Sequence, residues 1–210
     1  ISAKKWWFQD WGQILKRFTI FISLHLFLFL LVIAYQAQAS DDEWVIDRFE
    51  TTAYARVSGE IIYEDRLNFF IQASRNCEKV WQNFTFYTYE DSGDIKQLIN
   101  KHIPIKINGE AFTAEVNTVS PFLMGWRVMF TLGVYPLKEY IYHLNQHYLE
   151  EKKYEIEIVD GINFSAAKYF DIRKNSWKLD QLVPSVLQAT KLCRELSHKK
   201  LWLMIFLIGV

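Results

Sequence analysis

Two histidines in the second half of the chain have the spacing of a metal site. His143 and His147 lie four residues apart, and on a helix this spacing puts both imidazoles on one face. Glu139 and Glu151 fall one turn beyond them on either side, so two nitrogens and a carboxylate could hold a divalent cation. The glutamate that follows the first histidine in the zinc-protease motif is missing. The stripe predicts either the metal centre of a hydrolase or an ordinary solvated face.

The only two cysteines, Cys77 and Cys193, are too few for a disulfide-dense scaffold or a four-thiolate zinc site. In an oxidising compartment they would form one bridge, which we expect to clamp the C-terminal helix onto a sheet. Two separate buried thiols are the alternative. The bridge would be structural rather than catalytic.

Two further patterns suggest binding or modification. An aromatic group that fits a pleated strand favours core packing, with a ligand platform as the alternative; it comprises Phe84, Phe86, Tyr87 and Tyr89. Asn83-Phe-Thr and Asn163-Phe-Ser match the N-glycosylation pattern, which matters only in a eukaryotic host.

Composition and missing motifs exclude other classes. The chain is 50% apolar and 17% aromatic, so it is not a disordered tail. Its 24 basic and 24 acidic side chains balance to zero charge, which disfavours nucleic acid as a partner. No nucleophile elbow, phosphate loop or dinucleotide fingerprint occurs. We therefore expect no cofactor, and a non-enzymatic protein rather than an enzyme.

The first 39 residues predict export. Lys4, Lys5, Lys16 and Arg17 precede an uncharged apolar run at residues 18–35, which is just long enough to cross a bilayer from a cytoplasmic basic end. Ala37-Gln38-Ala39 then forms a small-residue cleavage site before an acidic stretch. The segment is a cleaved signal peptide or an uncleaved signal anchor, and we favour cleavage near Ala39.

The apolar tail at residues 199–210 leaves three interpretations open. After Lys199 and Lys200, ten residues carry no charge, which is too short a run to span a bilayer. It could be the start of a second membrane helix in a longer chain, a tail packed on the domain, or a partner-binding tail. The absence of an initiating Met favours the first interpretation.

Residues 44–196 predict one domain whose first two-thirds are mostly strand. Alternating or β-branched and aromatic patterns mark strands at 66–74, 81–89, 127–134, 154–159 and 166–172. Asn108-Gly109 between two alternating runs at 103–116 predicts a two-residue hairpin that pairs Ile107 with Glu110. Pro104 places its strand at an edge, or lies near the beginning of that strand.

Two helices complete the domain. Apolar residues recur at helical spacing from Pro136 to Lys153 and from Leu179 to Leu196. Pro184 is tolerable only if the second helix begins just before it. The expected fold is therefore α+β, a predominantly antiparallel sheet covered by one or two helices, preceded by the N-terminal membrane or signal helix.

These features favour a periplasmic or other extracytoplasmic domain, membrane-tethered or secreted. Its expected role is binding or assembly within an envelope complex, through a sheet edge or an aromatic groove. A metal-dependent hydrolase using His143 and His147, and a membrane-anchored ligand sensor, are the alternatives.

Overall fold

The computed structural model describes residues 44–90 and 92–207. The predicted export segment at 1–39, with its apolar run at 18–35, lies outside the described residues, as does the end of the tail at 208–210. In the part of the chain that is described, no helix combines the length and the apolar character needed to cross a membrane.

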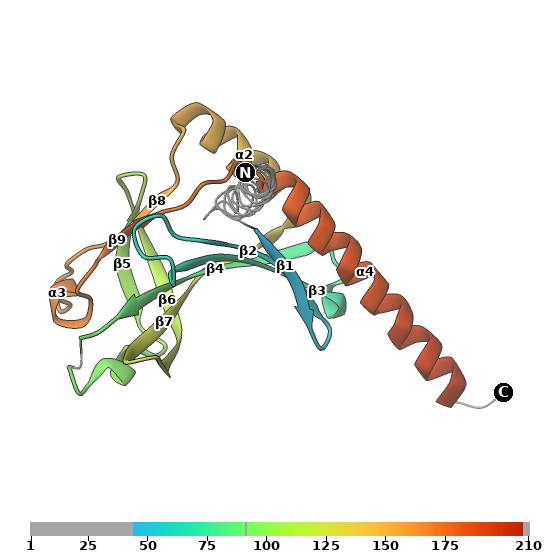
Figure 1. Ribbon diagram of the computed structural model, residues 1–210, viewed down its shortest axis with the longest axis horizontal. Helices are drawn as coiled ribbons and strands as arrows, with labels where there is room; N and C mark the ends of the chain where they lie inside the picture. The colour runs from blue at the N-terminus through green and yellow to red at the C-terminus, as the bar shows by residue number, and fades with distance from the viewer. Residues whose placement is uncertain (1–43, 91, 208–210) are drawn as a thin grey trace, which may run out of the picture. The chain divides into compact units, whose positions relative to one another are not determined.

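A single antiparallel sheet organises the described residues (Figure 1). Its nine strands follow the order β1-β2-β3-β4-β7-β6-β5-β8-β9. They span Val45–Phe49 (β1), Thr52–Ser58 (β2), Arg66–Gln72 (β3), Lys79–Thr88 (β4), His102–Ile107 (β5), Glu110–Phe122 (β6), Gly125–Pro136 (β7), Glu155–Ile158 (β8) and Lys174–Ser176 (β9). The expected sheet-dominated α+β class is confirmed.

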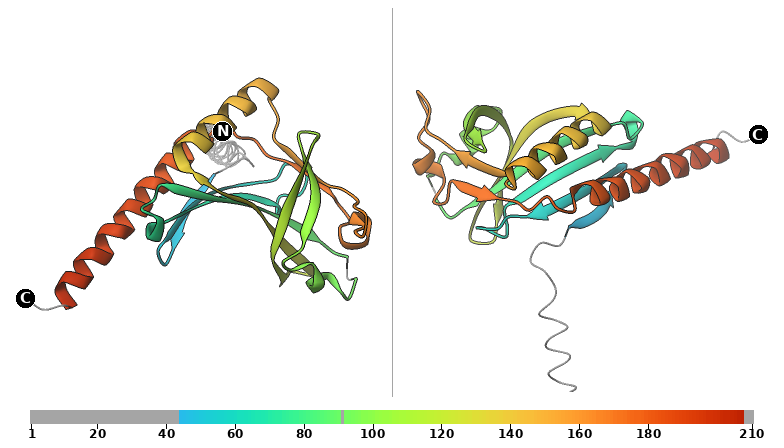
Figure 2. Two further views of the ribbon diagram at one scale, coloured as in Figure 1. Left: turned by 180° about the vertical axis from the view of Figure 1, so that it is seen from behind. Right: turned by 90° about the horizontal axis from the view of Figure 1, so that it is seen from above.

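In the described ranges, three α-helices and two 3-10 turns accompany the sheet. They are η1 (Ala73–Arg75), η2 (Ile95–Leu98), α2 (Leu137–Glu151), α3 (Ala166–Tyr169) and α4 (Leu182–Leu207). Helix α4 packs along β1, β2 and β3, and α2 contacts both α4 and β7. Figure 2 shows α2 and α4 crossing the same side of the sheet. Ala53 and Ala55 on β2 are fully buried, and such small side chains let a helix approach closely.

The hairpin prediction is confirmed in turn and register. Ile107 pairs with Glu110 and Ile105 with Phe112, while Asn108 and Gly109 adopt φ values of 49° and 89°. These positive angles are those of a type I′ turn. Strand β5 is internal, between β6 and β8, so Pro104 is tolerated because it lies near the start of β5, before the residues that pair with β8.

Both predicted helices exist with shifted ends. Helix α2 ends at Glu151, with Pro136 as its N-cap and the last residue of β7. Helix α4 begins at Leu182, two residues before Pro184, so the proline falls in the first turn. It continues beyond Leu196 to Leu207. The backbone at 199–207 is thus an extension of α4 rather than a separate element.

The predicted strand at 166–172 is wrong, because this segment contains the short helix α3. Its first backbone N–H, at Ala166, donates to the Asp160 carboxylate at 2.7 Å. Ala166 and Ala167 favour a helical turn, and the turn brings Tyr169 and Phe170 into the core. The strand lies slightly later, at β9.

The disulfide between Cys77 and Cys193 is present, with an S–S distance of 2.08 Å. It ties the loop after η1 to the buried face of α4, where Cys193 is completely inaccessible. The expected clamp between the sheet and the C-terminal helix is therefore confirmed.

Candidate functional site

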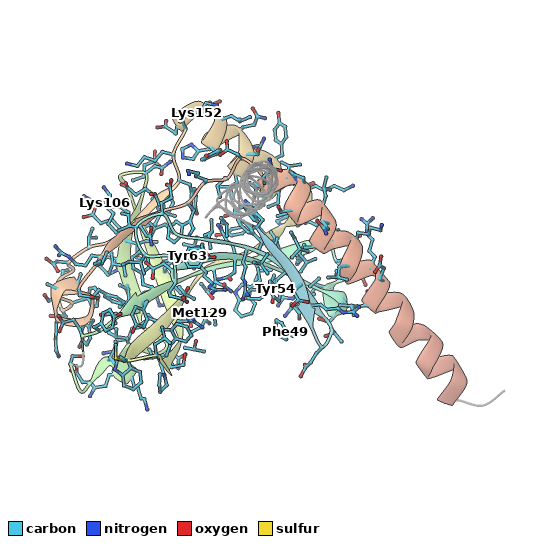
Figure 3. All side chains as sticks on the ribbon, viewed as in Figure 1. Phe49, Tyr54, Tyr63, Lys106, Met129 and Lys152 are labelled. Carbon is cyan, nitrogen blue, oxygen red and sulfur yellow. A yellow bond between two sulfur atoms is a disulfide. The ribbon has the colours of Figure 1, made fainter. Side chains whose placement is uncertain are left out.

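Strand register defines an open face, the side of β1–β4 and β7 that points away from α4. Paired residues point to the same side of a sheet and alternate residues to opposite sides. Ala53, Ala55 and Val57 face α4, so the intervening residues of β2 face the other way. In Figure 1 no helix of the described residues covers that side of β1–β4, and Figure 3 shows Tyr54 and Met129 there.

An aromatic ladder crosses four adjacent strands of the open face. Tyr54 pairs with Phe70 and Phe70 with Trp81, and the ring centroids lie 5.7 and 5.6 Å apart. Phe49 on β1 extends the ladder, 6.3 Å from Tyr54 and 6.0 Å from Phe70. Phe49 is 51% exposed and the other three rings are half-buried, so the ladder presents apolar edges to solvent.

An arginine cluster lies beside the ladder on the same face. Arg56 pairs with Asn68 across β2 and β3, and Arg66 is two residues before Asn68 on β3. Arg127 on β7 reaches the same region, because Arg66 and Arg127 approach one carboxylate oxygen, Oε2 of Glu64, at 3.6 and 3.5 Å. Burial and the charge of Arg66 lower the pKa of Arg127.

Glu64 compensates only part of this positive charge. Among the described residues, Arg56 makes no ion pair, and its guanidinium instead lies 5.2 Å from the centre of the Tyr54 ring. Asp47 and Glu115 are on the same side, next to Tyr54 and Thr131 in the register. Within the described residues neither forms an ion pair with an arginine of the cluster, and Oδ1 of Asp47 accepts a hydrogen bond from the Arg48 backbone N–H. The cluster of Arg56, Arg66 and Arg127 carries excess positive charge.

Unpartnered polar atoms gather in this cluster. Within the described part of the chain, Nε of each of the three arginines is buried without a hydrogen-bond partner. Asn83 pairs with Asn68 in the register and is completely buried, yet neither its Oδ1 nor its Nδ2 has a partner there. Leaving a buried amide unsatisfied costs free energy. These unpaired atoms therefore mark a place where binding of a ligand would be favoured.

A buried carboxylate lies next to Arg66 in the chain. Asp65, just before β3, is fully inaccessible and accepts hydrogen bonds from the Tyr87 backbone N–H at 2.6 Å and the Asn175 side-chain amide at 2.8 Å. Burial outweighs these bonds and raises the pKa of Asp65 to about 7. Its proton occupancy therefore changes near neutral pH.

The two histidines lie at a different place, a cavity of about 360 Å³ between α2 and the β5–β6 hairpin. Tyr135 and Tyr140 stack there with centroids 4.3 Å apart, and burial raises the pKa of Tyr140. Nε2 of His147 lies 3.1 Å from the Asn108 side-chain amide, so it accepts a hydrogen bond with the lone pair that a metal would use.

The structure brings His143 and His147 to one cavity, which Glu110 also lines. In residues 44–90 and 92–207, no three side chains of the types His, Cys, Asp and Glu converge as a metal site would require. Glu139 and Glu151 are exposed on α2. Metal binding there stays a prediction.

The predicted aromatic binding group is divided between core and surface. Phe84 and Phe86 are fully buried, and Phe84 stacks on Phe130 at 4.7 Å. Tyr87 is 5% exposed, whereas Tyr89 is 57% exposed. Of the four, Tyr89 alone presents most of its ring to solvent.

The two glycosylation patterns lie in contrasting surroundings. Asn83 is inaccessible in the middle of the sheet, whereas Asn163 is exposed in the turn before α3. In the folded chain only Asn163 offers its side chain to an enzyme. Both remain conditional on a eukaryotic host.

Sequence reasoning missed the open face because it missed β1 and β2. The signal was present in β2, where Tyr54 and Arg56 alternate with Ala53, Ala55 and Val57. In β3 Phe70 is an exception to the alternation of the strand, because it is an aromatic residue at a position whose neighbours on the same side, Asn68 and Gln72, are polar. Its pairing with Tyr54 and Trp81 explains that exception.

No protein-family model, curated protein sequence or solved structure matches this chain. Its function has to be inferred from its own residues.

Proposed function

We propose that this protein is an exported, non-enzymatic binding or assembly module that holds an extended acidic segment of a partner protein on its open face. The observation that carries the proposal is the aromatic ladder of Phe49, Tyr54, Phe70 and Trp81. Each ring contacts at least one other ring of the ladder, and no helix of the described residues covers this side of the sheet. Exposed aromatic surface rimmed by polar residues is typical of protein-binding sites.

The dimensions of the ladder suit a short stretch of extended chain. Neighbouring strands lie roughly 4.8 Å apart, so the steps from β1 to β4 span about 14 Å, or roughly four residues of an extended chain. Aromatic rings recognise such a segment through apolar and edge contacts, and they lose little conformational entropy on binding. A deep pocket is not required for this mode of binding.

Charge favours an acidic partner. Arg56, Arg66 and Arg127 lie beside the ladder, and among the described residues Glu64 alone forms ion pairs with them, while the Asp65 carboxylate also favours the charged form of Arg127. Nucleic acid is less suitable, because the whole chain has zero net charge and lacks the broad positive field that attracts phosphate backbones. Complementary charge would orient an acidic segment and speed its association.

The location belongs to the same proposal. We propose export through the basic flank and the apolar run at residues 18–35, with the domain on the outer, periplasmic side, either anchored through that run or released by cleavage near Ala39. The Cys77–Cys193 disulfide supports this assignment, because disulfides persist in oxidising compartments. The partner would then be another envelope protein.

Site-specific photo-crosslinking in the native host tests the proposal. A photoreactive phenylalanine replaces Tyr54, and the control replaces Tyr142, which is 62% exposed on α2. We expect a discrete adduct at position 54 that disappears in Arg56→Glu, and mass spectrometry should place the adduct in an acidic segment of the captured protein. A synthetic peptide of that segment should then bind the purified chain. Equal adducts at both positions, or none at 54, would refute the proposal.

A further inference from the structure

We infer that Arg56, Arg66 and Asn83 form a specific binding site for a single oxyanion group, a carboxylate or a phosphate. This inference goes beyond the proposed function, because the site needs no protein partner to operate. Its basis is the convergence of unpaired donors from three adjacent strands on one side of the sheet.

The register brings the three side chains together. Arg56, Asn68 and Asn83 form one row across β2, β3 and β4, in which each residue is the direct partner of the next. Arg66 belongs to the next row on the same side, diagonal to both Arg56 and Asn83. Diagonal neighbours in a sheet are roughly 7–8 Å apart, within reach of long side chains. One small anion between them can therefore contact both arginines.

The donors are also of the right chemical type. A guanidinium offers Nε and Nη donors in a planar fork that matches the two oxygens of a carboxylate or phosphate. Nε of Arg56 and Nε of Arg66 are buried without partners in the described residues, and so is Nδ2 of Asn83. An oxyanion would satisfy all three donors with charge-assisted hydrogen bonds.

Glu64 shows that arginines of this cluster can bind a carboxylate. Its carboxylate lies between Arg66 and Arg127, with Oε2 within 3.6 Å of both guanidinium groups. The sheet thus already seats one carboxylate between two arginines of this cluster. Arg56 has no such partner among the described residues, so its guanidinium is the one in the cluster that an external anion would pair with.

Asn83 distinguishes this site from a general basic patch. A surface patch binds anions through exposed lysines and arginines, whereas Asn83 is 0% exposed. A buried amide with both polar atoms unpartnered is rare in native proteins and calls for an explanation. A bound anion that accepts from Nδ2 supplies one.

The test is a titration of the purified full chain, labelled with ¹⁵N, with sodium phosphate, sodium acetate or sodium chloride at matched ionic strength. We expect phosphate or acetate to shift the Nε–Hε resonances of Arg56 and Arg66 and the side-chain amide resonances of Asn83. The shifts should saturate as the anion concentration rises. The oxyanion that binds more tightly identifies the ligand class. Equal shifts with chloride, or no saturable shift with either oxyanion, would overturn the inference.

Variants keep the test specific. Arg56→Gln should weaken binding about tenfold or more, because it removes a charge-assisted hydrogen bond, and Arg56→Lys should weaken it less because the charge is kept. The matched control, Arg75→Gln, alters an exposed arginine in η1 and should leave the affinity unchanged. Equal effects at positions 56 and 75 would contradict the site. Phe49→Ser removes one ring of the aromatic ladder and should leave oxyanion binding unchanged. If the partner proposal fails, the oxyanion titration therefore still tests this site by itself.

Discussion

The side-chain amide of Asn175 donates a hydrogen bond of 2.8 Å to the carboxylate of Asp65, 110 residues earlier in the chain, and both residues are fully buried. The contact joins the start of β3 to the edge strand β9. Asn175 also donates to the Ile62 carbonyl and accepts from the Ile61 N–H, so one side chain organises the loop between β2 and β3. A polar contact of this kind is sensitive to the protonation of Asp65.

The first prediction concerns pH. The folded pKa of Asp65 is about 7, against 3.8 for the unfolded group, so the native state binds more protons between these values. The stability that Asp65 contributes is therefore fully present below about pH 4 and is lost as the pH rises to about 7. The difference between the two pKa values corresponds to about 4 kcal/mol. In urea unfolding from pH 4 to 8, the free energy of unfolding of the wild type should fall with rising pH, whereas that of Asp65→Asn should not show this fall. Parallel profiles of the two proteins would contradict the prediction.

The second prediction concerns the disulfide. The bridge between Cys77 and Cys193 closes a loop with a sequence separation of 116 residues, so removing it enlarges the unfolded ensemble. Cys77→Ser and Cys193→Ser should each destabilise the protein by about 2–5 kcal/mol, with the double variant little worse than either. Chemical denaturation measures the cost. Thiol alkylation of the denatured, non-reduced protein should find no free thiol, and two free thiols would contradict the bridge.

The third prediction concerns the β5–β6 turn. Gly109 has φ of 89°, and a Cβ there would meet no atom within 4 Å, so substitutions act through backbone strain alone. Gly109→Val should cost about 1–2 kcal/mol and Gly109→Asn clearly less, since Asn tolerates a positive φ. Thermal melts of the two variants provide the comparison. Equal stabilities would exclude the type I′ assignment.

The fourth prediction concerns Asn108, whose side chain clamps the same turn to the start of β8. It donates to the Lys153 carbonyl at 2.9 Å and accepts from the Glu155 N–H at 2.8 Å. Asn108→Gly keeps the turn conformation but loses both of these bonds and the hydrogen bond to Nε2 of His147, so we expect a loss of about 1–3 kcal/mol. Asn100→Gly is the control, since exposed Asn100 has a similar φ of 65° and no side-chain bond in the described residues. Equal losses at the two positions would refute the clamp.

The fifth prediction concerns export. Residues 1–44 fused to a reporter that is active only outside the cytoplasm should give activity, because the basic flank and apolar run direct translocation. N-terminal sequencing of the full-length protein should show a mature start at Ser40 if the segment is cleaved. Retention of the uncleaved chain in alkaline-washed membranes would instead identify an anchor. Reporter activity confined to the cytoplasm would refute export.

Local features were readable from the sequence alone. Asn108-Gly109 determined the register of the β5–β6 hairpin, because a two-residue turn with positive φ values permits only one pairing of its flanks. The helical spacing of the apolar residues in α4 predicts its buried face, because this spacing places Val186, Thr190 and Cys193 on one side of the helix. Such signals depend on residues close together in the chain.

The tertiary structure decided which distant residues share a face. Burial does not alternate along most of strand β4, and Phe84 and Asn83 are equally buried although they point in opposite directions. Asp65 and Asn175 meet only because β9 completes the sheet edge. Arg56, Arg66 and Asn83 converge only through the pairing of β2, β3 and β4, since cross-strand register depends on long-range packing rather than on local pattern.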